Sequence, residues 1–449
     1  MISPISSING SETTGRYLVL LRENAVDSGI RTLRDYTGNK RVARAADFEN
    51  HAVTTEQLEQ TDDIVVLDKL GVAISTLHPE QLQSLHEVSD ENSPIAVIEP
   101  ERVVYALNDV GLGNVGQLTL NPTTNEAIEY LKGYRDAVDQ LIDRLVPTNG
   151  NGVQRISPLP RIQAIDETTA TWGLQITKVV NSKYSGRGIK VAVLDTGFDF
   201  THPDFTLRRI VSKSFIANQE VQDKQGHGTH CIGTACGPLS PSIPPRYGIG
   251  YETEIFAGKV LSNQGSGSDS GILAGIEWAI ANGCQIISMS LGARALPGQP
   301  YSRLFEVVAD RALRRGTLII AAAGNDSDHS SGIINPVGHP ANCPSIMAVG
   351  AINSQLQVAD FSNAGLNTNG GQVDIVGPGV DVYSSYLMPT RYRRLSGTSM
   401  ATPHVAGIAA LYAEAIGATG RVLWNRLTQN ALRLPLPSVD VGAGLVQAP

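Results

Sequence analysis

Several features of membrane proteins and nucleic-acid-binding proteins are missing from this sequence of 449 residues. No apolar run approaches the ~20 residues that a membrane-spanning helix needs, so we expect no membrane partner. The net charge is −8 and the isoelectric point about 5.6, which argues against a nucleic-acid partner. Hydrophobic residues make up 41% of the chain and charged residues only 17%. This composition predicts a globular protein with two or three domains.

Cysteine is also scarce, with four residues and no CxxC pair. Cys231 and Cys236 are five positions apart, which is not the spacing of a zinc knuckle. We therefore expect buried thiols and no zinc site formed by these cysteines.

The first 107 residues are predicted to form a separate acidic unit. They contain nine basic and 17 acidic residues, so the whole net charge of the chain lies here. Apolar periodicity predicts helices at 25–36 and 79–88 and strands at 16–22, 64–67, 71–77, 95–98 and 102–106. The order β-α-β-β-α-β is that of a small ferredoxin-like α+β domain.

Residues 108–170 are predicted to be a linker that contains one amphipathic helix at 123–146. Thr123 and Glu126 form a capping box at its start, and Pro147 follows its end. The apolar stripe of this helix packs on a neighbouring domain or, as the alternative, binds a partner.

From residue 171 onwards, strand-like and helix-like segments alternate. The runs at 189–195, 254–261, 285–291, 317–323 and 345–352 are almost entirely apolar, as is typical of strands buried on both faces. Helices are expected at 227–236, 270–282, 302–315 and 399–415. The pattern predicts an α/β fold with a mostly parallel sheet and helices on both sides.

Four polar residues lie where these strands end or these helices begin. Asp195 ends a strand, His227 opens a helix, Asn325 follows another strand, and Ser399 lies where a loop enters a helix. Each could simply be a turn residue or a helix cap. Together they supply a carboxylate, a base, an amide donor and a nucleophile, which are the groups that acyl transfer through serine requires.

The motifs around these residues, VAVLDTGFDFTHPDF, GHGTHCIGTACG and GTSMATPHVAGIAALY, resemble those of the subtilisin family of serine proteases. The resemblance covers roughly residues 171–449 and implies a three-layer subtilisin-like fold. It implies that Asp195 orients the imidazole, that His227 acts as general base and then acid, and that Ser399 attacks the peptide bond. Asn325 matches the oxyanion-hole residue of the family, joined by the backbone N–H of Ser399.

The resemblance also extends to the substrate cleft. Two segments match those that pair with an extended peptide, namely Ser266, Gly267 and Ser268, and Ser290, Leu291 and Gly292. The walls and floor of the S1 pocket are matched by Ala322, Ala323, Gly324 and Gly338. None of these positions carries an acid or a base, so we expect broad or apolar selectivity.

By the same resemblance, residues 1–107 look like the propeptide of subtilisins, an inhibitor that also assists folding. Its last strand would enter the cleft, and the processing site would lie near Leu107 or within 147–170. A propeptide of this type favours secretion. The start MISPISSINGSETTG instead shows no secretory signal and favours a cytoplasmic location, so the compartment stays open.

A calcium site of the family is matched only in part. Asp204 corresponds to a calcium ligand, but the loop expected to supply the others, GPLSPSIPPRYGIGYET, has four prolines and no Asn or Asp. The chemistry itself requires no cofactor. Structural Ca²⁺ at Asp204 therefore remains an open expectation.

The sequence as a whole predicts a serine endopeptidase zymogen, with peptides or proteins as substrates and its own propeptide as an intramolecular inhibitor. One alternative is a non-catalytic peptide-binding protein that retains its propeptide, although the intact set of four polar residues argues against it. Another is a processing protease dedicated to one substrate. Broad digestion of casein would count against that second alternative.

Overall fold

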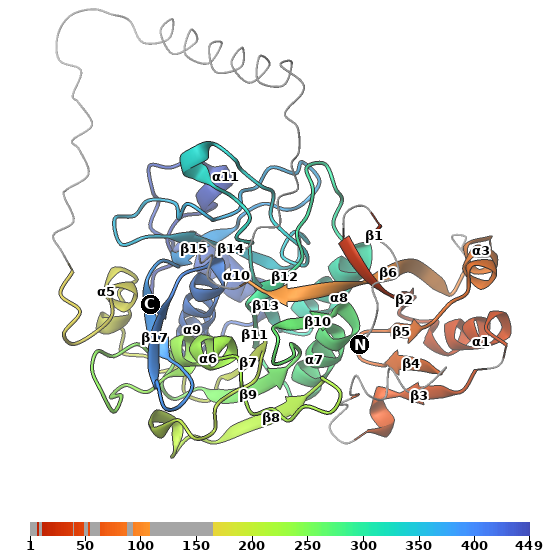
Figure 1. Cartoon of the computed structure of the whole chain (residues 1–449), viewed down its shortest axis with the longest axis horizontal. Helices are drawn as coiled ribbons and strands as arrows, with labels where there is room; N and C mark the ends of the chain where they lie inside the picture. Colours follow the sequence, from red (N-terminus) through yellow and green to blue (C-terminus); the bar gives the residue numbers. More distant parts are fainter. Residues whose placement is uncertain are drawn as a thin grey trace, which may run out of the picture. The chain divides into compact units, whose positions relative to one another are not determined.

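The computed structural model describes residues 7–8, 11–38, 40–48, 53, 63–87, 93–107 and 165–449 (Figure 1). We call residues 7–107 of this set the N-terminal module and residues 165–449 the C-terminal domain. The predicted linker helix at 123–146 lies outside the described residues. No helix of the described part is long and apolar enough to cross a membrane.

The C-terminal domain is built on a parallel seven-stranded sheet with the strand order β15-β14-β13-β11-β7-β9-β8. Five of its strands are those predicted: β7 (Lys190–Asp195), β9 (Glu254–Lys259), β11 (Ile286–Met289), β13 (Leu318–Ala322) and β14 (Met347–Ile352). The two edge strands, β8 (Ile210–Ser214) and β15 (Ile375–Pro378), were not predicted. β8 is only partly buried and β15 contains Gly and Pro, so neither shows the continuous apolar pattern.

Helices cover the sheet on both sides, which confirms the predicted three-layer α/β fold (Figure 1). α6 (His227–Cys236) packs against α9 (Thr398–Ile416) and β7, and α9 also lies along β11, β13, β14 and β15. α7 (Asp269–Ala281) packs on β7 and β9, and α8 (Arg303–Arg314) packs on β13 and α10 (Gly420–Gln429). α6 and α9 are buried almost all round, because each lies between the sheet and other parts of the chain.

The remaining elements of the domain are short. They are α5 (Trp172–Ile176), η3 (Val179–Asn181), η4 (Pro203–Phe205), β10 (Ser266–Ser268), β12 (Leu291–Gly292), η5 (His329–Ser331), β16 (Val382–Ser385), β17 (Tyr392–Leu395) and α11 (Ser438–Val441).

The N-terminal module has the predicted ferredoxin-like order. Its elements are β1 (Ser7–Ile8), β2 (Ser11–Leu21), α1 (Val26–Tyr36), β3 (Val42–Arg44), η1 (Ala45–Asp47), β4 (Ile64–Leu67), β5 (Val72–Ser75), α3 (Pro79–Glu87) and β6 (Ile95–Ala106). The central strands are arranged β6-β2-β5-β4, and β3 adds to β4 in parallel. The two strands predicted at 95–98 and 102–106 are one strand. Pro100 lies opposite Tyr17, next to a register shift, and so does not interrupt it.

β6 also extends beyond its own sheet into the C-terminal domain. Its residues 103–105 pair antiparallel with β10, and 105–106 pair with β12. One strand therefore belongs to both parts of the chain and brings the end of the module to the carboxyl edge of the parallel sheet (Figure 1).

Candidate active site

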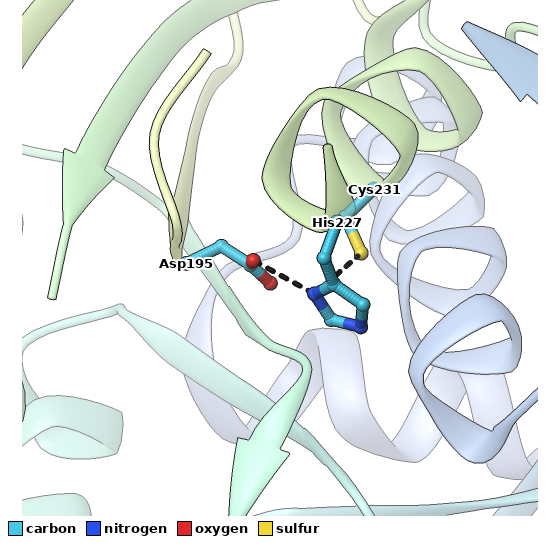
Figure 2. A group of neighbouring side chains, drawn as sticks. All are labelled: Asp195, His227 and Cys231. Atoms are coloured by element: carbon cyan, nitrogen blue, oxygen red, sulfur yellow. Dashed lines mark hydrogen bonds and ion pairs between the residues drawn. The ribbon is translucent and has the colours of Figure 1, made fainter. Parts of the chain in front are cut away.

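The end of β7 and the start of α6 bring Asp195 and His227 together (Figure 2). Gly197 (φ 110°) turns the chain after the strand, and Gly226 (φ 99°) precedes the helix, both in backbone conformations that favour glycine. Asp195 Oδ1 accepts a hydrogen bond from His227 Nδ1 at 2.7 Å, and both side chains are buried. Burial opposes the charged imidazole, but the Asp195 carboxylate outweighs it and raises the pKa of His227 well above its ordinary value.

A second buried carboxylate, Asp223, fixes the geometry of this pair. It accepts hydrogen bonds from the backbone N–H of Gly226 and Thr229 and from the hydroxyl groups of Thr196 and Thr229. The Thr196 hydroxyl also accepts from the N–H of Gly228. The loop after Asp195 and the first turn of α6 are thus tied to one group. Asp223 was not predicted, because a single acid in a loop has no distinctive pattern and its link to Thr196 spans 27 positions.

Lys259 is another buried group near Asp195 that the sequence did not reveal. Lys259 on β9 lies opposite Asp195 on β7 in the register of the two strands. Its Nζ donates to the Thr196 carbonyl. Burial lowers the pKa of Lys259 to about 8, although the nearby Asp223 and Asp195 carboxylates act in the opposite direction.

Ser399 lies in the first turn of α9, where the positive end of the helix dipole favours developing negative charge. Its Oγ lies 2.9 Å from the Leu107 carbonyl oxygen and 3.1 Å from the Ser290 carbonyl oxygen. His227 Nε2 is buried and has no hydrogen-bond partner in the described part of the chain. The Asp195–His227 link is therefore formed, while the hydroxyl of Ser399 is directed at carbonyl oxygens instead of the imidazole.

Asn325 presents its amide to the same carbonyl oxygen. Its Nδ2 donates to the Leu107 carbonyl oxygen at 3.1 Å. Its Oδ1 accepts from the Thr398 N–H at 2.9 Å and from the Thr398 hydroxyl at 2.8 Å, which fixes the orientation of the amide. The N–H of Ser399, expected as a second donor, is not among the described donors to the Leu107 oxygen.

The predicted cleft segments lie on either side of β6. Ser266, Gly267 and Ser268 form β10 and pair with Tyr105, Val104 and Val103, and Leu291 and Gly292 form β12 and pair with Ala106 and Tyr105. The carbonyl of Ser290 accepts from the N–H of Leu107 at 3.4 Å. The arrangement is that of a peptide strand added between two protein strands.

The side chain of Leu107 lines a cavity at the end of this strand. Gly292, Ala322, Gly324 and Gly338 line it as well, and the carbonyl of Ala323 accepts from the N–H of Gly338 to join two of its walls. The same cavity is also lined by Arg294 and Asp326. Both residues lie outside the four positions matched from the sequence, which themselves carry no charge, and Glu12 of the N-terminal module lines the cavity as well.

Both carboxylate oxygens of Asp204 accept hydrogen bonds from other residues of the protein. Its Oδ1 accepts from the N–H and hydroxyl of Ser242, and its Oδ2 accepts from the hydroxyl groups of Tyr247 and Tyr392. Burial would raise the pKa of Asp204, but the hydrogen bonds from Ser242 and Tyr247 outweigh it and lower the pKa. Both oxygens face O–H and N–H donors, a set that does not fit Ca²⁺, which needs several oxygen acceptors around it.

Cys231 lies one helical turn after His227, and its Sγ is 3.9 Å from Nδ1 (Figure 2). Among the described residues, Asp195, His227 and Cys231 are the one group of three potential metal ligands that lie close together. Within this group, Asp195 Oδ1 and His227 Nδ1 are already hydrogen-bonded to each other. All four cysteines are buried and free, as expected.

Known proteins with similar sequences were found for most of the chain. The model of the subtilase family matches residues 186–436, which include Asp195, His227, Asn325 and Ser399. Subtilisin E of Bacillus subtilis (strain 168) is 44% identical over 230 residues, 51% of this chain and 56% of that protein. The match therefore spans little more than half the length of subtilisin E.

Two further relatives match over longer stretches. A thermostable alkaline protease of Halalkalibacterium halodurans is 38% identical over 308 residues, which cover 66% of this chain and 79% of the relative. M-protease of Shouchella clausii (strain KSM-K16) is 35% identical over 406 residues, which cover 89% of this chain and 88% of the relative. The chain therefore belongs to the subtilase family of serine proteases.

Proposed function

We propose that the protein is a serine endopeptidase zymogen that cleaves its own chain after Leu107. The observation that carries the proposal is the position of the Leu107 carbonyl. Its oxygen lies 2.9 Å from Ser399 Oγ and 3.1 Å from Asn325 Nδ2, so the bond that follows it faces both a nucleophile and an oxyanion donor.

The residues of this site are suited to hydrolysis through an acyl-enzyme. Ser399 Oγ attacks the Leu107 carbonyl carbon, and its proton passes to His227 Nε2, which is unpartnered among the described residues and thus available. Asp195 stabilises the imidazolium that forms. Asn325 Nδ2 stabilises the oxyanion. His227 then protonates the leaving amine, and water hydrolyses the ester on Ser399 by the reverse proton path.

In this proposal, residues 1–107 are the inhibitory propeptide, 108–170 a linker and 171–449 the catalytic domain. The support is that β6 fills the cleft between β10 and β12, where a substrate would have to bind. Of the two expected processing regions, we therefore propose that cleavage occurs after Leu107 and not within 147–170.

The preferred residue before the cleaved bond is proposed to be apolar. Leu107 is an apolar residue that lines the cavity here, and the small residues Gly292, Ala322, Gly324 and Gly338 line it as well. Arg294 and Asp326 of the same lining carry opposite charges, so neither sign of substrate charge is favoured outright.

Intact mass spectrometry over time tests the proposal with the wild type, Ser399→Ala and Ser212→Ala. The matched control Ser212 is exposed on the edge strand β8. We expect the wild type and Ser212→Ala to lose a fragment that ends at Leu107, while Ser399→Ala stays at 47.8 kDa. Cleavage within 147–170 would correct the processing site.

Two other outcomes would overturn more of the proposal. Cleavage of Ser399→Ala at the wild-type rate would show that another protease does the processing. An uncut wild type that also fails to react with a fluorophosphonate would favour a non-catalytic peptide-binding protein.

A further inference from the structure

A buried acid at the start of α7 contacts the last strand of the N-terminal module where the strand enters the cleft. Asp269 is fully buried, and its Oδ2 accepts from the backbone N–H of Arg102 at 3.1 Å and from Arg102 Nη1 at 3.3 Å. Its Oδ1 accepts from His339 Nε2 at 2.9 Å. The acid thus binds both the backbone and the side chain of one residue of β6.

The contact with His339 leaves the negative charge of Asp269 available to Arg102. A carboxylate can only accept, so the Nε2 of His339 carries the shared proton. The Nδ1 of His339 is buried and has no hydrogen-bond partner among the described residues. A second proton at Nδ1 would be a buried donor without an acceptor, which is costly. The guanidinium of Arg102 is the charged group of the module that contacts Oδ2 of this carboxylate.

Arg102 occupies a defined place relative to the bond at Ser399. Counted back from Leu107 as the first residue, Arg102 is the sixth. Between them, 103–105 pair with β10 in a fixed antiparallel register that sets Val103 opposite Ser268. A substrate strand that binds in the same register has its sixth residue at Asp269.

The second carboxylate beside Arg102 belongs to the module and leaves with it. Glu99 lies 3.4 Å from Arg102, whereas Asp269 belongs to the C-terminal domain and stays in the cleft. Once β6 has left, Oδ2 of Asp269 has lost both of its donors from Arg102. The backbone N–H of any substrate residue can replace one of them, but only a side chain with its own donor can replace the other.

We propose that Asp269 is a specificity-determining residue that selects substrates with a basic side chain at the sixth position before the cleaved bond, with arginine preferred. The proposal rests on the endopeptidase function proposed above. Arginine fits better than lysine, because Nη1 reaches the carboxylate while the stem lies along the groove at only 16% exposure. Glutamate at this position would meet a carboxylate of the same sign.

Competition between peptides in one reaction tests the proposal with the processed protein freed of its N-terminal fragment. The peptides have the sequence Gly-X-Val-Val-Tyr-Ala-Leu-Asn-Gly, copied from β6, with Arg, Lys, Gln or Glu as X. A further peptide carries Gln as X and Arg at the fourth position instead. Mass spectrometry reads cleavage after Leu, and the ratio of kcat/KM values follows from the relative depletion.

We expect Arg to exceed Gln by about five- to tenfold, the size of one partly buried ion pair, with Lys between them and Glu below Gln. In Asp269→Asn the Arg-to-Gln ratio should fall to about one. In Asp310→Asn, which changes a half-buried acid on α8 that pairs with Arg314, the ratio should stay as in the wild type.

Equal kcat/KM for Arg and Gln in the wild type would overturn the proposal without any need for a variant. A gain from Arg at the fourth position but not at the sixth would also overturn it, because the register would differ from that of β6. If none of the peptides is cleaved and casein is not digested either, the proposed endopeptidase function fails instead.

Discussion

The N-terminal module contacts the C-terminal domain in two places that differ in their chemistry. In the cleft, β6 pairs with β10 and β12, and the Leu107 carbonyl lies next to Ser399. Outside the cleft, the turn between β4 and β5 lies on α7 and α8. There Glu277 accepts the N–H groups of Lys69 and Leu70 at 2.8 and 3.0 Å.

The turn contact is completed by arginines from the end of α8. Arg311 donates to the carbonyls of Leu70 and Leu21, and Arg315, which follows the helix, donates to the Lys69 carbonyl. Each of these hydrogen bonds links a side chain of the C-terminal domain with backbone of the module. The turn is therefore recognised largely by its shape.

Because the two contacts differ, cleavage of the chain and dissociation of the N-terminal module depend on different residues. Hydrolysis after Leu107 would break the covalent link at the cleft, but it would leave the contact of Glu277 unchanged. A cleaved module is thus expected to remain bound until the turn contact opens. Cutting depends on the residues around Ser399, and retention depends to a large extent on α7 and α8.

The largest expected effect is on cutting, through Asn325→Ala. The substitution removes the amide that donates to the Leu107 oxygen, so we expect self-cleavage to slow by about 10²–10³-fold. Intact mass over time measures the rate. Asn425→Ala, an exposed position on α10, is the matched control and should cleave as the wild type does. A normal rate in folded Asn325→Ala would mean that another donor stabilises the oxyanion.

The next effect is on retention, through Glu277→Ala. The N–H groups of Lys69 and Leu70 lose their acceptor, and a net cost of ~1–3 kcal/mol should speed release of the module by about tenfold to a hundredfold. Release can be measured by gel filtration of a Ser399→Ala chain that has been nicked at a foreign protease site inserted between 108 and 165.

Glu254→Ala in the same nicked chain is the control, since Glu254 is exposed at the start of β9. It should release the module as slowly as the unmodified nicked chain. If Glu277→Ala releases the module no faster than this control, Glu277 does not contribute to retention, and the cleft strand and the arginines of the turn contact hold the module.

The contrast between these two contacts also explains what the sequence could predict. The residues around Ser399 lie in long motifs at strand ends and helix starts, so Asp195, His227 and Asn325 could be named from local pattern. Glu277 and Asp269 lie within α7, where a single acid on a helix has no distinctive pattern. Their partners in the N-terminal module lie more than 150 positions away in the sequence, and His339, the other partner of Asp269, lies 70 positions away.

In the fold, too, features with a local sequence pattern were predicted and features that depend on tertiary contacts were not. The buried strands of the parallel sheet were predicted, because burial on both faces leaves a continuous apolar run. β6 was predicted as two strands, because Pro100 and its acidic neighbours break the apolar pattern. Its continuity comes from pairing with β2 on one side and with β10 and β12 beyond, which is tertiary information.

The smallest expected effect is a dependence of retention on pH. Burial under the module raises the pKa of Glu277 to about 7, although the N–H groups of Lys69 and Leu70 act in the opposite direction. In the released domain the carboxyl group is solvated and should titrate near its ordinary value of ~4.3. Because the pKa is higher in the complex, binding takes up a proton, so the complex is favoured at low pH. It weakens as the pH rises from ~4.3 to about 7 and is constant above that.

We therefore expect the nicked chain to release its module about tenfold faster at pH 8 than at pH 5. Gel filtration of samples taken at successive times measures the release rate. Glu277→Gln is the matched control, because it keeps the size of the side chain and removes the titration. Its release rates at the two pH values should differ much less than those of the wild-type side chain. An equal pH dependence in both chains would assign the effect to other groups of the interface, and the turn contact would then contribute to retention through its hydrogen bonds alone.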